Sequence, residues 1–165
     1  KMKKIIFLTI SIISLLFINA CTGYKPIFSS SNFNFIIEDH TIKGEERLAN
    51  LIYRKLYNVS SANADNKSVQ SINLSIETIK EKNATVKNSA GKILEYEINL
   101  RTIIIIKDYL TEKTILNQIF NYSISYKVQD EHSETLKLEN KNIENLVNKT
   151  FQELLIKITE VLSEK

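Results

Sequence analysis

Residues 93–109, ILEYEINLRTIIIIKDY, decide the fold because they form the longest strand that the sequence predicts. Apolar and polar side chains alternate along most of this stretch, which is the pattern of a strand with one buried face. The side chains expected on the buried face are Leu94, Tyr96, Ile98, Leu100, Thr102, Ile104 and Ile106, and those on the other face are Glu95, Glu97, Asn99 and Arg101. The alternation is lost at Ile103 and Ile105, which predicts that the far end of the strand is covered on both faces.

Turn signals on both sides of this strand predict neighbouring strands joined to it by hairpins. Ser89–Lys92 contains glycine and is expected to connect it to a strand over 69–88, with an irregularity near residue 80. Leu110–Lys113 is expected to turn into a fourth strand, Thr114–Val128. Further upstream, Asn32–His40 alternates as a first strand, and Asp39–Gly44 is predicted to be the turn that ends it.

Two stretches change to the three-to-four spacing of amphipathic helices. Residues 45–57 place an apolar stripe opposite charged side chains, and a loop is expected over Val59–Lys67. A closing helix is predicted to begin between Thr135 and Asn142, after a charged loop over Gln129–Glu134. The stripe of the closing helix consists of Ile143, Leu146, Val147, Phe151, Leu154, Leu155, Ile158, Val161 and Leu162.

The expected element order is β-α-β-β-β-α. Strands joined by hairpins pair antiparallel, and two amphipathic helices can bury their stripes on one side of such a sheet. The sequence therefore predicts an α+β fold with a four-stranded, mostly antiparallel sheet and two helices on one face. The opposite face would be polar and open to a partner.

The N-terminus has the pattern of a lipoprotein signal peptide. Two lysines precede an apolar run over 5–18, and the only cysteine follows the small residue Ala20. Ile18-Asn19-Ala20-Cys21 matches a bacterial lipobox, so we expect cleavage between Ala20 and Cys21 and attachment of diacylglycerol and a further acyl chain to Cys21. An uncleaved membrane anchor is the alternative, although the run is shorter than the ~20 residues that a spanning helix needs. Thr22, rather than aspartate, follows the cysteine and favours export to the outer membrane.

The chain divides into three expected parts. Residues 1–20 are the signal peptide, 21–31 are the lipidated N-terminus with a polar tether, and 32–165 form a single domain. The net charge of +3 comes entirely from Lys1, Lys3 and Lys4, so the remainder of the chain is neutral. A neutral domain has no overall field that would attract nucleic acid, and we expect no nucleic-acid partner.

The sequence contains no recognisable set of catalytic residues. His40 and His132 are the only histidines, and both are predicted to lie in turns, each near an aspartate. No nucleophile motif accompanies them, no second cysteine is available for a metal site, and the glycines are too scattered for a phosphate loop. Glu95 and Glu97 form a carboxylate pair of the kind that any solvated strand face carries. We therefore expect neither an enzyme nor a metal or cofactor.

Basic residues near the hairpins are the remaining candidates for ligand contact. Lys87 and Lys92 flank the turn before the long strand, Arg101 and Lys107 lie along it, and Lys113 precedes the fourth strand. If these residues met at one end of the sheet, they would bind the phosphates of an anionic glycolipid. The alternative is that they are ordinary edge lysines, which discourage aggregation between strands.

Two short motifs resemble the alphaproteobacterial branch of the LPS-assembly lipoprotein family LptE. Cys21-Thr22-Gly23-Tyr24-Lys25-Pro26-Ile27-Phe28 is similar to the Cys-Gly-Phe-x-Pro-Leu-Tyr opening of the family, with Thr22 where glycine is usual. Residues 122–130, YSISYKVQD, are similar to a Ser-Tyr-Asn-Val-x-Asp segment, and the closing helix has a counterpart.

The resemblance implies a non-catalytic lipoprotein of the outer membrane. Such a protein fills and helps to assemble the LptD β-barrel, and the pair inserts lipopolysaccharide into the outer leaflet. The implied partners are the barrel, lipopolysaccharide and, through the anchor, the membrane. Two other classes stay open from the residues alone: an outer-membrane lipoprotein that activates a cell-envelope enzyme, and a periplasmic enzyme.

Overall fold

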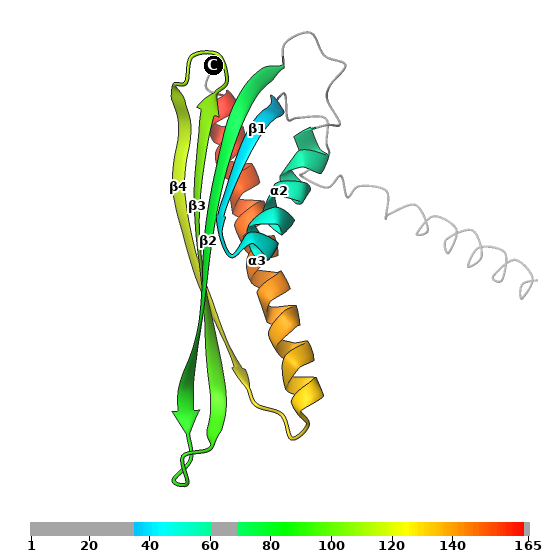
Figure 1. Cartoon of the computed structure of the whole chain (residues 1–165), viewed down its shortest axis with the longest axis vertical. Coiled ribbons are helices and arrows are strands. Elements are labelled where there is room, and N and C mark those ends of the chain that lie inside the picture. Colours follow the sequence, from blue (N-terminus) through cyan, green and yellow to red (C-terminus); the bar gives the residue numbers. More distant parts are fainter. Residues whose placement is uncertain (1–34, 61–68, 164–165) are drawn as a thin grey trace, which may run out of the picture.

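The computed structural model describes residues 35–60 and 69–163, which form one sheet and two helices (Figure 1). The sheet has the strand order β1-β2-β3-β4, with β1 parallel to β2 and the other neighbours antiparallel. Both helices lie on one face of the sheet, so the predicted α+β architecture and element order are confirmed. The elements are β1 (Phe35–Gly44), α2 (Glu46–Ser60), β2 (Gln70–Lys87), β3 (Ile93–Asp108), β4 (Thr114–Lys127) and α3 (His132–Ser163).

The first strand is longer than predicted, and the turn expected over Asp39–Gly44 is wrong. β1 continues to Gly44, but its register against β2 shifts between Ile37 and Asp39. Before the shift, Ile37 faces the helices, and after it Ile42 does so, so one extra residue interrupts the alternation. A bulge of this kind has no period in the sequence, which is why the stretch resembled a turn.

Gly44 ends β1 with a sharp change of direction into α2. Its φ angle is +75°, in the left-handed region that glycine adopts without a steric penalty. The next residue, Glu45, donates its backbone N–H to the carbonyl oxygen of Thr78 at 2.7 Å. The helix then carries the chain back so that β2 runs parallel to β1, as a parallel connection requires.

The β2–β3 hairpin extends well beyond α2, and its tip extends past the lower end of α3 (Figure 1). β1 pairs with β2 only as far as Thr78, and residues 81–92 are all exposed. The expected turn at 89–92 and the irregularity in β2 are both present, although the register shifts lie between Ala84 and Lys87 rather than near residue 80.

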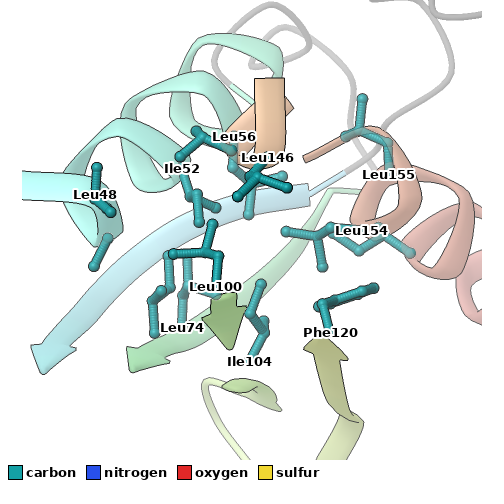
Figure 2. Packing of buried hydrophobic residues seen from close by; sticks show 14 of the residues in the cluster. Leu48, Ile52, Leu56, Leu74, Leu100, Ile104, Phe120, Leu146, Leu154 and Leu155 are labelled. Atoms are coloured by element: carbon teal, nitrogen blue, oxygen red, sulfur yellow. The ribbon is translucent and has the colours of Figure 1, made fainter. Parts of the chain in front are cut away.

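The core lies between the sheet and the two helices. α2 contributes Leu48, Ile52 and Leu56, and α3 adds its own stripe, so the predicted apolar faces are confirmed (Figure 2). The side chain of Leu162 lies outside the described residues. The completely or almost completely buried apolar side chains include Phe35, Leu48, Ile52, Leu56, Ile72, Leu74, Ile76, Ile98, Leu100, Ile104, Leu154 and Leu155.

The closing helix begins earlier than predicted, at His132, so part of the expected charged loop is helical. Thr135 is buried at this end, where its hydroxyl accepts a hydrogen bond from the backbone N–H of Gln129 at 2.9 Å. This contact joins the end of β4 to the first turn of the helix. The polar composition of 129–134 concealed a helix start, since its apolar stripe begins only later.

Candidate docking face

The open face is the side of the sheet opposite the helices, and no described element covers it. The strand registers place equivalent side chains in rows across β2, β3 and β4, because each residue of β3 from Glu95 to Lys107 has a partner on either side. The main residues of this face are Asn73, Ser75, Glu77, Ile79, Glu81, Glu97, Asn99, Arg101, Ile103, Ile105, Asn117, Ile119, Asn121 and Ser123.

A polar hollow of about 380 Å³ lies in the middle of the open face. Arg101 is exposed there, between its register partners Ile79 and Asn121. Next to it, the amide of Asn99 donates to the carboxylate of Glu97 at 3.0 Å. The side chains on this face are the cation of Arg101, the carboxylate of Glu81, the amides of Asn99 and Asn121, the hydroxyl of Ser123 and the aliphatic Ile79. This mixture suits a hydroxyl-rich ligand, and Arg101 adds one contact for a phosphate. The hollow is lined by Ile79, Glu81, Asn99, Leu100, Arg101, Asn121, Tyr122 and Ser123.

A second hollow of about 270 Å³ lies toward the β1 edge. The amide nitrogen of Asn73 donates to Glu112 at 3.1 Å, and the ammonium of Lys107 is 3.6 Å from the same carboxylate. The amide oxygen of Asn73 is buried and accepts no hydrogen bond from the described residues. Asp39 also lines this hollow, which therefore offers mainly acceptor groups.

Isoleucines interrupt the polar surface between the two hollows. Ile103 and Ile105 are partly buried on the open face, so the prediction that both faces of the strand end are covered is wrong for the described residues. Ile79 is 39% exposed and Ile119 is 43% exposed on the same face. The open face thus has a narrow strip of apolar side chains with polar side chains on both sides. The prediction of a polar face was correct except for this strip.

The five predicted basic contacts do not form one cluster. Lys87 and Lys92 lie together at the end of the β2–β3 hairpin, whereas Lys107 and Lys113 lie at the opposite end of β3. The two ends are roughly 45 Å apart at the ordinary rise of a strand. Arg101 lies between them, in the central hollow.

Lys82, which is close in sequence to the hairpin lysines, faces the helices. Lys82 forms an ion pair with Glu139 of α3 at 2.6 Å and lies 4.1 Å above the ring of Tyr96. The hydroxyl of Tyr126 donates to the same carboxylate at 2.9 Å. These contacts attach the N-terminal half of α3 to β2, β3 and β4. Nothing in the residue spacing predicted them.

The pKa values of this group follow from partial burial and close pairing. Burial is the largest single influence and opposes the charged forms of Lys82 and Glu139. Their hydrogen bonds to each other and to Tyr126, together with charge attraction, outweigh burial, so the pKa of Lys82 is raised and that of Glu139 is lowered. The pKa of the Tyr126 hydroxyl is raised, chiefly by burial. Lys82 and Glu139 are therefore both charged at neutral pH, and the pair has a structural role.

The two histidines do not meet. His40 lies in β1, not in a turn, and its ring stacks on Tyr53 of α2 with centroids 4.0 Å apart. His132 is the first residue of α3, so its predicted placement in a turn is also wrong. Glu95, one of the two carboxylates noted in the sequence, accepts a hydrogen bond from the hydroxyl of Thr85 at 3.1 Å. Over residues 35–60 and 69–163, no three histidine, cysteine or acidic side chains gather as a metal site would require.

The predicted lipidation site, Cys21, and the cleavage position after Ala20 lie outside the described residues. The signal peptide over 1–20 and the tether over 21–31 lie outside them as well. Among the helices that are described, none is both long and apolar enough to cross a bilayer.

No family model matches the sequence, and no curated protein matches it. Several solved structures share the fold. A solution structure of uncharacterized lipoprotein B from Nitrosomonas europaea is 16% identical, with a TM-score of 0.60 over 86% of this chain and 94% of that one. A minor lipoprotein from Acinetobacter baumannii is 11% identical, with a TM-score of 0.56 over 78% of this chain and 92% of that one.

A third structure, from Caulobacter crescentus, is provisionally described as a lipoprotein. It is 13% identical, with a TM-score of 0.52 over 82% of this chain and 93% of the other. At these identities the likeness is one of fold. The chain therefore has a fold that bacterial lipoproteins use, and the family resemblance is supported at that coarse level.

Proposed function

We propose that this protein is a non-catalytic outer-membrane lipoprotein that fits its open face inside a β-barrel of the LptD type. In this role it helps the barrel to assemble and takes part in passing lipopolysaccharide to the outer leaflet. The observation that carries the proposal is the open face itself, a broad surface of amides, hydroxyls and a few charges that the described chain leaves uncovered.

The polarity of the open face suits the interior of a large barrel. Lumen-facing side chains of outer-membrane barrels are polar and hydrated, so a plug needs hydrogen-bonding groups rather than a continuous apolar patch. Asn99, Asn121 and Ser123 supply such groups across β3 and β4. The apolar strip at Ile103 and Ile119 adds limited apolar contact, and most of the face stays polar.

The central hollow is the best candidate for glycolipid contact. Arg101 offers a planar guanidinium that pairs with phosphate through two hydrogen bonds, and the neighbouring amides and hydroxyls match sugar hydroxyls. Lys87, Lys92, Lys107 and Lys113 lie too far away to share a ligand head group with it. We therefore assign the first contact to Arg101 and keep the lysines as secondary candidates.

The lipid anchor supplies the localisation in this proposal. Acyl chains on Cys21 would hold the domain at the periplasmic side of the outer membrane, because each buried methylene contributes about 0.8 kcal/mol to membrane binding. The anchor would also raise the local concentration of the domain near its barrel partner.

Site-specific photo-crosslinking in cells tests which partner meets the open face. A photo-reactive phenylalanine analogue at Asn99 samples the face, and the same group at the exposed Glu144 of α3 is the matched control. The proposal expects a β-barrel protein crosslinked from position 99 and much less from position 144. A peptidoglycan synthase captured from position 99 would favour the adaptor function, and equal barrel capture from both positions would refute docking by this face.

A further inference from the structure

The two outer edges of the sheet differ in charge. The outer edge opposite β4 is β1, which carries Glu38, Asp39 and Lys43, and beyond Thr78 it is β2, which carries Lys80, Glu81 and Lys87. Charged side chains of this kind discourage pairing with other strands. In β4, by contrast, residues 114–126 contain neither a charged residue nor proline. Sheet proteins usually protect an exposed strand of this length, so its neutrality needs a reason.

The backbone of β4 is free to pair along its outer edge. Val128 donates its N–H to Leu94 of β3 at 2.9 Å, which directs the even-numbered backbone groups of β4 toward β3. The odd-numbered groups therefore point away from the sheet. The side-chain amides of Gln118 and Gln129 cover the carbonyls of Ile119 and Lys127 at 3.3 and 3.0 Å, as outward-pointing carbonyls allow.

No described strand pairs with this edge between Ile119 and Lys127 or anywhere else along it. We propose that β4 pairs antiparallel with β4 of a second copy of this chain, so that the two sheets become continuous about a two-fold axis at Asn121. Asn121 lies next to the middle of the neutral stretch, and no described strand pairs with the backbone of the odd-numbered residues on either side of it. The carbonyl of Ile119 exchanges its contact with the side chain of Gln118 for the new strand.

The side chains of β4 are complementary to themselves in this register. Ile119 lies opposite Ser123 of the second copy on the open face, and Phe120 lies opposite Tyr122 on the helix side. No two like charges face each other along the neutral stretch, and an aromatic pair across strands is favourable. The dimer is thus proposed for the chain without its barrel, because the proposed function concerns the open face of one copy.

The same flank of α3 favours a second copy. Lys149 lies 4.3 Å above the ring of Tyr122, so this side of α3 borders β4. Ile156 follows about two turns later on that side and is 45% exposed. A second copy paired along β4 would lie against this side of α3, where an exposed apolar side chain can be covered.

Pairing β4 with the other edge of a neighbouring copy is disfavoured. Such a contact would place the neutral strand against the charged residues of β1 and of the far end of β2. It would also not close, because each new copy would expose another β4. Pairing of β4 with itself closes after two copies. The charge pattern of the two edges thus selects a dimer over a fibre.

A disulfide at the proposed axis tests the pairing directly. Residues opposite each other in an antiparallel pair have Cα atoms about 5.5 Å apart, within the range that a disulfide spans. The full chain carrying Asn121→Cys should form a disulfide dimer on mild oxidation. Thr41→Cys, on the exposed outer edge of β1, is the matched control and should stay monomeric.

A charge at the same position supplies the second test. In the variant Asn121→Lys, two ammonium groups would face each other at the axis, and their repulsion should weaken the dimer about tenfold in light scattering or sedimentation. Thr41→Lys should leave the dimer unchanged, and circular dichroism checks that each variant is folded. A monomer at all concentrations, with no specific disulfide in the Asn121→Cys variant, would overturn the proposal, as would a dimer that Asn121→Lys leaves intact. Neither test depends on the barrel, so the proposal fails or stands separately from the proposed function.

Discussion

Replacing Gly44 with alanine should destabilise the fold more than the same replacement at Gly91, the other glycine of the described chain. A Cβ atom at Gly44 would overlap the carbonyl oxygen of Thr78 and lie 3.0 Å from its carbonyl carbon. The same oxygen accepts the hydrogen bond of Glu45. The clash is with backbone, so no side-chain rotation relieves it, and either β1 or the start of α2 must shift.

Three contributions set the size of the effect. A left-handed φ in a residue with a Cβ costs about 1–2 kcal/mol. Overpacking against the backbone costs about 1–3 kcal/mol, and weakening the Glu45–Thr78 hydrogen bond adds about 1 kcal/mol. We therefore expect Gly44→Ala to remove about 3–6 kcal/mol, a large part of the 5–15 kcal/mol that ordinary domains have.

Gly91 provides a matched control for this prediction. Its φ is +81°, yet nothing lies within 4 Å of the position a Cβ would take. Gly91→Ala should therefore show only the conformational penalty of about 1–2 kcal/mol. Urea unfolding of the full chain and both variants, followed by circular dichroism, measures the free energies. Equal losses for the two variants would refute the role assigned to the close approach between Gly44 and Thr78.

Three further predictions concern the core, the ion pair and the anchor. Thr78 and Thr102 are register partners, both completely buried, and neither hydroxyl has a hydrogen bond to a described residue. Changing both to valine should raise the free energy of unfolding, measured by urea titration, by about 1–2 kcal/mol. A lower free energy of unfolding would contradict this. The folded-state pKa of Glu139 is lowered, so the stability from its pair with Lys82 is present above the unfolded pKa and declines as the pH falls through the folded one. The Glu139→Gln variant should have a free energy of unfolding about 1–3 kcal/mol lower than the unchanged protein at pH 7. Its stability should also fall less on acidification. If stability depended on pH in the same way in both proteins, that would argue against the pair. Mass spectrometry of the protein from cells should find Cys21 as an acylated N-terminal residue, and a bare thiol with residues 1–20 still attached would refute lipidation.

The parts of the fold that could be predicted are those with a continuous period. The alternation in β3 and the stripe of α3 each repeat over many residues, so single exceptions did not hide them. β1 was cut short because one extra residue at its bulge moved Ile42 onto the face that Ile37 had occupied. The parallel pairing of β1 with β2 likewise depends on the direction of α2, which no local pattern records.

The candidate site was predicted in outline only. The polar residues of β3 and β4 were recognised as an open face because they alternate with core residues. Ile79 and Ile119 were missed on that face, although each is two residues from a polar residue of the same face, because both interrupt the polar alternation. The contact of Lys82 with Glu139 was missed because it joins residues far apart in the sequence.

Purification of the protein from its own membranes tests the central claim most directly. Extracted in mild detergent and isolated through an affinity tag at its C-terminus, the protein should carry one outer-membrane β-barrel protein in equimolar amount. Arg101→Glu, in the central hollow, should reduce the lipopolysaccharide recovered with the pair without unfolding the domain, because Arg101 is exposed. Recovery without any barrel, or with a peptidoglycan synthase in its place, would contradict the account.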